Sequence, residues 1–285
     1  MQDYFESLVV PVDFGPKTSL VIKQAFILGQ LMNCDVVLLY VHNPEINNYE
    51  GAMEAASVQL HELANTAQMK YNHPFFPVMK DGDVTKCIVD FATSAYARMI
   101  VMGNNSESAS SEKNISHIGA NTGKIIREAE CPVLTISSDI IYDLDKMLLP
   151  LDLSKPVDQK LNWAIYFSRI FGCIIKIITI APDNNKLKNE KLTEKMFGIK
   201  TILNDCNVFC TTDILYTNNS NENNSKIIIS YARKNDCDLI MIMTQQEDKK
   251  KEMQVGRTAS GIISLSEKPV ISITPHVHSE IVKNF

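Results

Sequence analysis

The sequence predicts an α/β protein of two domains, each a five-stranded parallel sheet flanked by helices. Short apolar runs alternate with segments whose apolar residues recur at helical spacing, which is typical of parallel sheets covered on both faces. The opening segment LVVPVD at 8–13 returns as LLPLD at 148–152. ECPVLTI at 130–136 returns as EKPVISI at 267–273. A unit of about 140 residues is therefore repeated in a chain of 285, and we expect domains at 1–140 and 141–285.

In the first copy, residues 7–12 form a nearly continuous apolar run, which favours a strand buried on both faces of a sheet. Gly15 and Pro16 end this run, and apolar residues then recur at helical spacing from Val21 to Met32. By the same criteria we expect further strands at 36–41, 75–79, 99–102 and 133–136, and helices at 49–71, around 88–92 and at 121–129.

Two residues of the first copy give more local predictions. Pro77 has no backbone N–H to donate, so the strand at 75–79 is expected at a sheet edge or to be irregular. Asp83 precedes an apolar helical pattern and is expected to cap the N-terminus of that helix.

The second copy repeats the order of strands and helices. The junction of the copies is expected at 137–145, and the polar tail from Pro275 is expected to fray. The expected strands lie at 148–151, 174–180, 209–215, 239–243 and 270–273, and the helices at about 161–171, 185–205, 225–235 and 258–266.

Composition excludes several classes of protein. Hydrophobic residues make up 45% and charged residues 21%, which is ordinary for a globular chain. The net charge of −5 argues against nucleic acid or an acidic membrane as the partner. No apolar run is long enough to span a membrane, and no signal peptide is visible. The seven scattered cysteines indicate reduced thiols in the cytoplasm, with Cys34 and Cys173 buried just before a strand.

The ends of the strands carry the candidate ligand contacts, because ligands of open parallel sheets bind beyond the carboxyl ends of the strands. Asp13 and Asp152 each close the first strand of a copy. Such a carboxylate can accept hydrogen bonds from a ribose hydroxyl or an adenine amino group, or it can cap the following turn, and position alone leaves both interpretations open. Gly103 and Gly119 would let backbone N–H groups approach a phosphate closely.

The whole chain resembles a tandem universal stress protein. The resemblance implies two Rossmann-like domains of the adenine nucleotide alpha hydrolase-like type, arranged as an internal pseudo-dimer in which strand 133–136 runs antiparallel to strand 270–273. The similar segments are LVVPVDFGPKTS at 8–19, VVLLYVH at 36–42, ARMIVMG at 97–103 and IGANTGKIIREAECPVLTIS at 118–137, and then LLPLDLSKP at 148–156, DLIMIMT at 238–244 and VGRTASGIISLSEKPVISIT at 255–274.

Some members of this family bind ATP or AMP, and they share a loop of the pattern Gly-x2-Gly-x9-Gly-Ser/Thr. The first copy matches the outer glycines with Gly103 and Gly119, but Ser106 takes the second position and Ala120 replaces the hydroxyl residue. It also has 15 residues between the outer glycines where the pattern has 12. The first copy therefore keeps part of the chemistry and loses the spacing.

The second copy keeps the spacing, with 12 residues between Met243 and Gly256. Met243 and Gln246 replace the first two glycines, and Arg257 replaces the hydroxyl residue. A methionine side chain is a steric obstacle where a phosphate should meet bare backbone. Lys249–Lys251 and Arg257 could hold a different anion, or they could simply form a solvated, charged loop.

We therefore expect a non-catalytic, cytoplasmic stress-response protein that acts as a ligand-sensing or interaction module with degenerate nucleotide-binding loops. One alternative is a regulator that binds ATP or AMP through the first domain, and another is a slow ATP hydrolase, for which no base is identifiable. The partners would be a small adenine nucleotide or a protein, and a further homodimer is left open. The candidate contacts are Val12, Asp13, Val41, Gly103, Gly119 and Ala120 in the first domain, and Asp152, Gly256 and Arg257 in the second.

Histidines offer two weaker candidates. His276 and His278 have the spacing of metal ligands on one strand face, but no third ligand is evident, so no metal site is expected. His42 follows the second strand close to the expected cleft, without an accompanying nucleophile.

Overall fold

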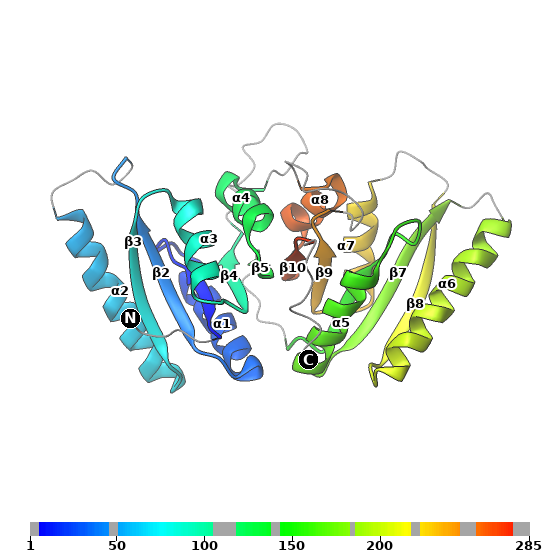
Figure 1. Ribbon diagram of the computed structural model, residues 1–285, viewed down its shortest axis with the longest axis horizontal. Coiled ribbons are helices and arrows are strands. Elements are labelled where there is room, and N and C mark those ends of the chain that lie inside the picture. The colour runs from blue at the N-terminus through cyan, green and yellow to red at the C-terminus, as the bar shows by residue number, and fades with distance from the viewer. Residues whose placement is uncertain are drawn as a thin grey trace. The chain divides into compact units, whose positions relative to one another are not determined.

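The computed structural model describes two compact units, which we call unit 1 and unit 2 (Figure 1). Unit 1 comprises the described residues up to 137, and unit 2 those from 143 onward. The expected domain boundary at 140/141 falls outside the described residues. The structure describes residues 6–45, 51–104, 118–137, 143–182, 186–217, 223–245 and 255–275.

Unit 1 contains a five-stranded parallel sheet with the strand order β3-β2-β1-β4-β5. Helices α1 and α2 pack on one side of the sheet, and α3 packs with α4 on the other (Figure 1). The elements are β1 (Leu8–Pro11), α1 (Thr18–Met32), β2 (Val36–His42), α2 (Ala52–Tyr71), β3 (Phe75–Asp81), α3 (Val84–Ser94), β4 (Met99–Gly103), α4 (Ala120–Glu128) and β5 (Val133–Ile136).

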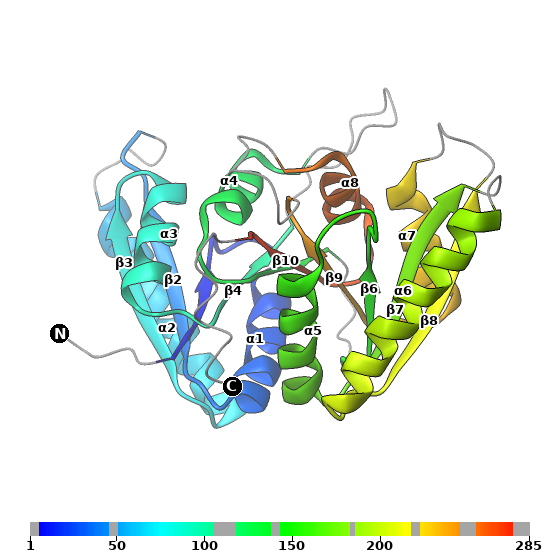
Figure 2. The ribbon, with the colours of Figure 1, turned by 45° about the vertical axis from the view of Figure 1, so that its right-hand side comes forward.

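Unit 2 has the same architecture, with the strand order β8-β7-β6-β9-β10 and parallel pairing throughout. Figure 2 shows α5 and α6 beside its strands. The elements are β6 (Lys146–Pro150), α5 (Asp158–Phe171), β7 (Ile174–Pro182), α6 (Lys186–Asp205), β8 (Cys210–Thr217), α7 (Asn224–Lys234), β9 (Leu239–Met243), α8 (Arg257–Leu265) and β10 (Val270–Ile273). The expected fold class is confirmed.

The first helix of each unit ends in the same way. Asn33 and Gly172 follow α1 and α5 with left-handed φ values of 50° and 68°, which turn the chain back toward the sheet. The next residues, Cys34 and Cys173, are buried at 6% and 4% exposure, as expected. The repeat seen in the sequence is therefore also a repeat of local backbone geometry.

The local predictions at Pro77 and Asp83 are confirmed. Among the described residues β3, which contains Pro77, pairs with β2 alone and so forms an edge of the unit 1 sheet. Asp83 Oδ1 accepts a hydrogen bond of 2.8 Å from the backbone N–H of Lys86, which caps α3. This acceptor satisfies one of the N–H groups that a helix start leaves without an intrahelical partner.

Several strands extend beyond their expected ends, among them β3 and β7. The prediction for β3 stopped at residue 79, but parallel pairing with β2 continues to the partners His42 and Asp81. β7 likewise reaches Pro182, whose partner on β8 is Thr217. Backbone pairing with the neighbouring strand carries both strands past the apolar residues that marked them.

No helix in the described part of the chain combines the length and apolarity required to cross a membrane.

Candidate functional site

A cavity of about 440 Å³ lies at the edge of unit 2 where the carboxyl ends of β6, β7 and β9 meet the first turns of α5 and α8. Apolar side chains from the strands and helices form much of its wall, including Ile178, Ile242 and Ile262, each at most 3% exposed. This is the edge at which parallel sheets bind ligands. The cavity combines an apolar wall with a few polar side chains, as small-molecule sites do.

Three cationic side chains in the described part of the chain line the same cavity. Lys155 and Lys160 come from the segment that follows β6 into α5, and both are half-buried. Lys160 Nζ donates a hydrogen bond of 3.4 Å to the backbone oxygen of Pro150, the last residue of β6. Arg257 is the first residue of α8 and is exposed. We call Lys155, Lys160 and Arg257 the cationic rim.

The acid that ends the first strand is tied to the turn behind it in both units. Asp152 Oδ1 accepts hydrogen bonds from the backbone N–H and the hydroxyl of Ser154, at 3.0 and 2.6 Å. Asp13 Oδ1 accepts one of 2.8 Å from the backbone N–H of Gly15. The capping interpretation is therefore confirmed, and contact of either acid with a ligand stays a prediction.

Gly256 fixes the start of α8 against the end of β9. Its backbone N–H donates a hydrogen bond of 2.8 Å to the oxygen of Thr244, and a Cβ at this position would lie 3.3 Å from the same oxygen. The backbone N–H of this candidate contact is thus engaged within the protein. Met243, expected to obstruct the site, is 7% exposed and lines the cavity, which retains its volume of about 440 Å³.

The ends of the last two strands are linked in each unit. In unit 2 the hydroxyls of Thr244 and Thr274 lie 3.1 Å apart. In unit 1 the amide of Asn104 donates to the Ser137 hydroxyl at 3.4 Å. Lys17 Nζ also donates to the backbone oxygens of Asn104 and Ser137, at 3.3 and 3.0 Å. An ammonium group therefore sits at the strand ends of unit 1, a contact that sequence reasoning missed.

The other candidate contacts of unit 1 end neighbouring strands. Val12 and Val41 are buried at the ends of β1 and β2, and the Val12 N–H donates to the oxygen of Leu39 at 2.9 Å. Gly103 ends β4. These strands are adjacent in the sheet, so the predicted residues gather at one edge.

The loop positions are described only in part. Gly119 is the N-cap of α4 in an extended conformation, with φ −51° and ψ 139°, and Ala120 is the first residue of that helix. Gly256 has nearly the same geometry at α8, with φ −55° and ψ 146°. The remaining candidates in the loops and tail, Ser106, Gln246, Lys249–Lys251, His276 and His278, lie outside the described residues.

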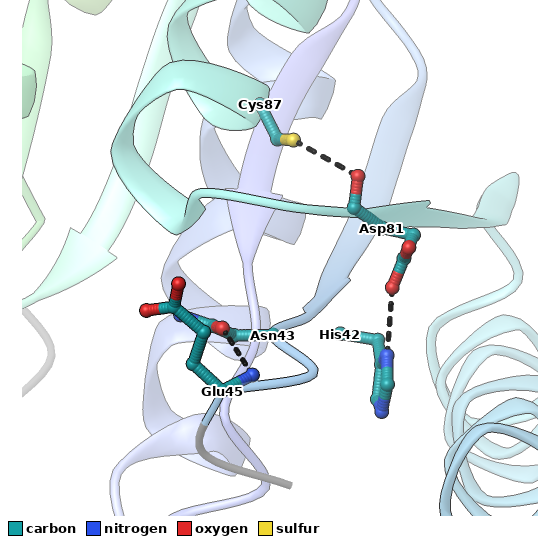
Figure 3. A network of polar contacts seen from close by, with 5 residues as sticks. All are labelled: His42, Asn43, Glu45, Asp81 and Cys87. Carbon is teal, nitrogen blue, oxygen red and sulfur yellow. Dashed lines mark hydrogen bonds and ion pairs between the residues drawn. The ribbon is translucent and has the colours of Figure 1, made fainter. Parts of the chain in front are cut away.

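His42 has a carboxylate partner that sequence analysis did not identify. Its Nδ1 lies 2.7 Å from Asp81 Oδ1, while the Cys87 thiol donates to the Asp81 backbone oxygen at 3.7 Å (Figure 3). Burial and the nearby Asp83 carboxylate raise the pKa of Cys87. The parallel register of β2 and β3 places His42 opposite Asp81, and the apolar pattern of β3, which stops at Met79, gave no signal for this contact. Within the described residues, no cluster of three metal-binding side chains is found.

Comparison with known proteins agrees with this architecture. Residues 5–137 match the profile described as Universal stress protein family. A universal stress protein structure from Archaeoglobus fulgidus DSM 4304 is 17% identical, with a TM-score of 0.74, over 96% of this chain and 98% of that chain. A functionally unknown protein from Pseudomonas aeruginosa PAO1 is 15% identical, with a TM-score of 0.72, over 96% of this chain and 94% of that one. At these identities the likeness concerns the fold. No curated protein matches the chain.

Proposed function

We propose that the protein is a non-catalytic stress-response module of two universal stress protein domains in tandem, which senses a ligand of the adenine nucleotide type. The family match at residues 5–137 supports the first domain. The repeated segments, the shared strand order and the shared left-handed helix ends at Asn33 and Gly172 support a second domain of the same kind.

The observation that carries the ligand-sensing role is the cavity in unit 2. Its volume of about 440 Å³ lies within the range of small-molecule sites, roughly 300–1,000 Å³. It stands at the strand ends where nucleotide-type ligands bind in parallel sheets. The apolar wall would hold a ring system, and the polar side chains would fix its orientation.

The lining of the cavity supports a binding role without catalysis. Among the described residues that line it, Asp152 is the one acid, and its Oδ1 already accepts two hydrogen bonds from Ser154. General acid–base catalysis needs a group placed to move a proton at the reacting atom. We infer that the bound ligand is held and released unchanged.

We place the protein in the cytoplasm, because all seven cysteines, each within the described residues, are free thiols. An antiparallel pairing of strand 133–136 with strand 270–273, which would hide two sheet edges, stays part of the proposal. So does a protein partner or a further homodimer.

Thermal unfolding with adenosine, AMP and ATP tests the proposal. A ligand at 100 times its dissociation constant should stabilise the protein by about 2.7 kcal/mol. Ile180 lines the cavity at the position that Val41 takes in unit 1, so Ile180→Phe and Val41→Phe form a matched pair. We expect Ile180→Phe to remove the ligand-induced shift and Val41→Phe to retain it.

The other results are equally informative. Loss of the shift in Val41→Phe alone would move the site to unit 1, which is the alternative of a nucleotide-binding regulator acting through the first domain. No shift with any of the three ligands would contradict the proposal. Release of phosphate from ATP that is abolished by Ile180→Phe would show a hydrolase instead.

A further inference from the structure

We propose that the cavity of unit 2 binds a phosphate monoester as a free anion, with the phosphate held by the cationic rim rather than by a glycine loop and a divalent metal ion. The inference rests on the proposed role of this cavity as a ligand site. It adds the chemical class of the ligand and the residues that select it.

The charge of the cavity fits one phosphate group. Among the described residues, three cations, Lys155, Lys160 and Arg257, and one carboxylate, Asp152, line it, and their formal charges sum to +2. A phosphate monoester carries about −1.5 to −2 at pH 7. Because the two lysines are half-buried in a concave site, their charges are screened less than those of fully exposed side chains.

The described backbone of unit 2 offers a phosphate fewer N–H donors than a glycine loop would. The Gly256 N–H donates to Thr244, and the Met243 side chain lines the cavity where the family pattern has a glycine. Arg257 stands directly after Gly256, at the positive end of the α8 helix dipole. A guanidinium group can bind two phosphate oxygens at once, so it can replace the lost backbone donors.

A triphosphate fits this site poorly. It carries more negative charge than the rim can balance, and proteins usually bind it together with Mg²⁺, which prefers carboxylate and other oxygen ligands. Asp152 is the one acid among the described lining residues, and its Oδ1 is engaged by Ser154. The ligand class is therefore an apolar or aromatic body that carries a single phosphate, such as a nucleoside monophosphate.

Unit 1 lacks the cationic rim. By the 139-residue offset of Asp13 and Asp152, Lys155 and Lys160 correspond to Pro16 and Val21, and by the 137-residue offset of the C-terminal segments, Arg257 corresponds to Ala120. None of these three residues can carry a charge. The preference for a phosphate monoester is thus assigned to unit 2.

Calorimetric titration of the full chain tests the inference. We expect AMP to bind equally well in EDTA and in Mg²⁺, and adenosine to bind at least tenfold more weakly. Arg257→Gln and Lys155→Gln should each weaken AMP binding about tenfold and leave adenosine binding unchanged. The control is Lys234→Gln, which removes an exposed positive charge at the C-terminal end of α7, outside the cavity lining, and should leave AMP binding unchanged.

Several outcomes would overturn the inference. If adenosine bound as tightly as AMP, or if Arg257→Gln and Lys155→Gln left AMP binding unchanged, the rim would not hold the phosphate, yet the proposed ligand-sensing function would stand. Tighter binding of ATP with Mg²⁺ than of AMP would also refute the inference alone. Failure of adenosine, AMP and ATP to bind would refute the proposed function as well. Unfolding of each variant without ligand checks that it is folded.

Discussion

Asp152 lines the cavity of unit 2, Asp13 takes the corresponding position in unit 1, and each acid maintains the turn behind it. In each case a carboxylate oxygen accepts a hydrogen bond from the backbone N–H of the residue two positions further on, which stabilises the turn after the first strand of the unit. Substitution of these acids therefore affects the stability of the turn before any ligand is considered. Loss of ligand binding in an alanine variant alone would not show direct contact.

Asp152→Ala should lower the free energy of unfolding by about 1 kcal/mol, because the backbone N–H of Ser154 loses its acceptor. Asp152→Asn keeps an Oδ1 acceptor and should cost less than half as much. Urea unfolding of both variants measures the difference. Equal stability of the alanine and asparagine variants would contradict the role of Oδ1 in the turn.

Sequence reasoning identified the residues of the site that end strands and, at the start of α8, Gly256 and Arg257, but it did not identify Lys155 and Lys160. The places of Asp13 and Asp152 follow from the apolar runs that precede them. No local pattern distinguishes Lys155 and Lys160 from other charged residues near a helix start. Only the fold, which places Lys160 beside the Pro150 oxygen at the end of β6, brings them to the cavity. The partners of Lys17 lie 87 and 120 residues away along the chain, which no local pattern encodes.

At the scale of elements, α7 and α8 pack closely at one glycine. A Cβ on Gly261 of α8 would lie 2.8 Å from the Cβ of Ser225 in α7, which is closer than side-chain carbon atoms can approach. Gly198 of α6 is also helical, but a Cβ there meets nothing within 4 Å. The close packing of α7 and α8 therefore requires a glycine at position 261, whereas no neighbouring atom requires one at position 198.

Gly261→Ala should destabilise unit 2 by about 1–3 kcal/mol through overpacking. Gly198→Ala should instead stabilise it by about 0.5–1 kcal/mol, because alanine loses less backbone entropy in a helix. Thermal or urea unfolding of the matched pair gives both signs. A stabilising Gly261→Ala would show that α7 and α8 are not in this close contact.

Element types were predicted well because each buried face repeats its apolar residues with a clear period. Element ends were predicted less well. The run to Met79 in β3 gave no reason to include Lys80 and Asp81, which are polar and exposed. Their pairing with Val41 and His42 of β2 decides where the strand ends, and that information lies in another part of the sequence.

At the scale of the molecule, both units bury thiols in their cores. Burial raises the pKa of Cys34 in unit 1 to about 11, and it raises those of Cys173 and Cys237 in unit 2 to about 11. The usual value in an unfolded chain is 9.0. Between these two pKa values the folded state retains thiol protons that the unfolded state has lost. The free energy of unfolding therefore keeps the full contribution of the buried thiols below pH 9 and decreases as the pH rises toward 11.

The free energy of unfolding should therefore decrease between pH 9 and pH 11, by on the order of 2 kcal/mol for each buried thiol. Denaturant unfolding at a series of pH values measures this loss. Cys34→Ala removes one titrating group without adding bulk, and the variant should show a smaller loss over the same range. An identical pH profile in parent and variant would exclude the contribution of Cys34.

Joining two domains in one polypeptide removes a constraint that binds assemblies of identical subunits. In a homodimer encoded by one gene, every substitution appears in both copies, so a cationic site would necessarily occur twice. Here Arg257 has Ala120 as its counterpart, and Lys160 has Val21. The chain can thus evolve two dissimilar sites while their stoichiometry stays fixed at one to one, whatever the level of expression.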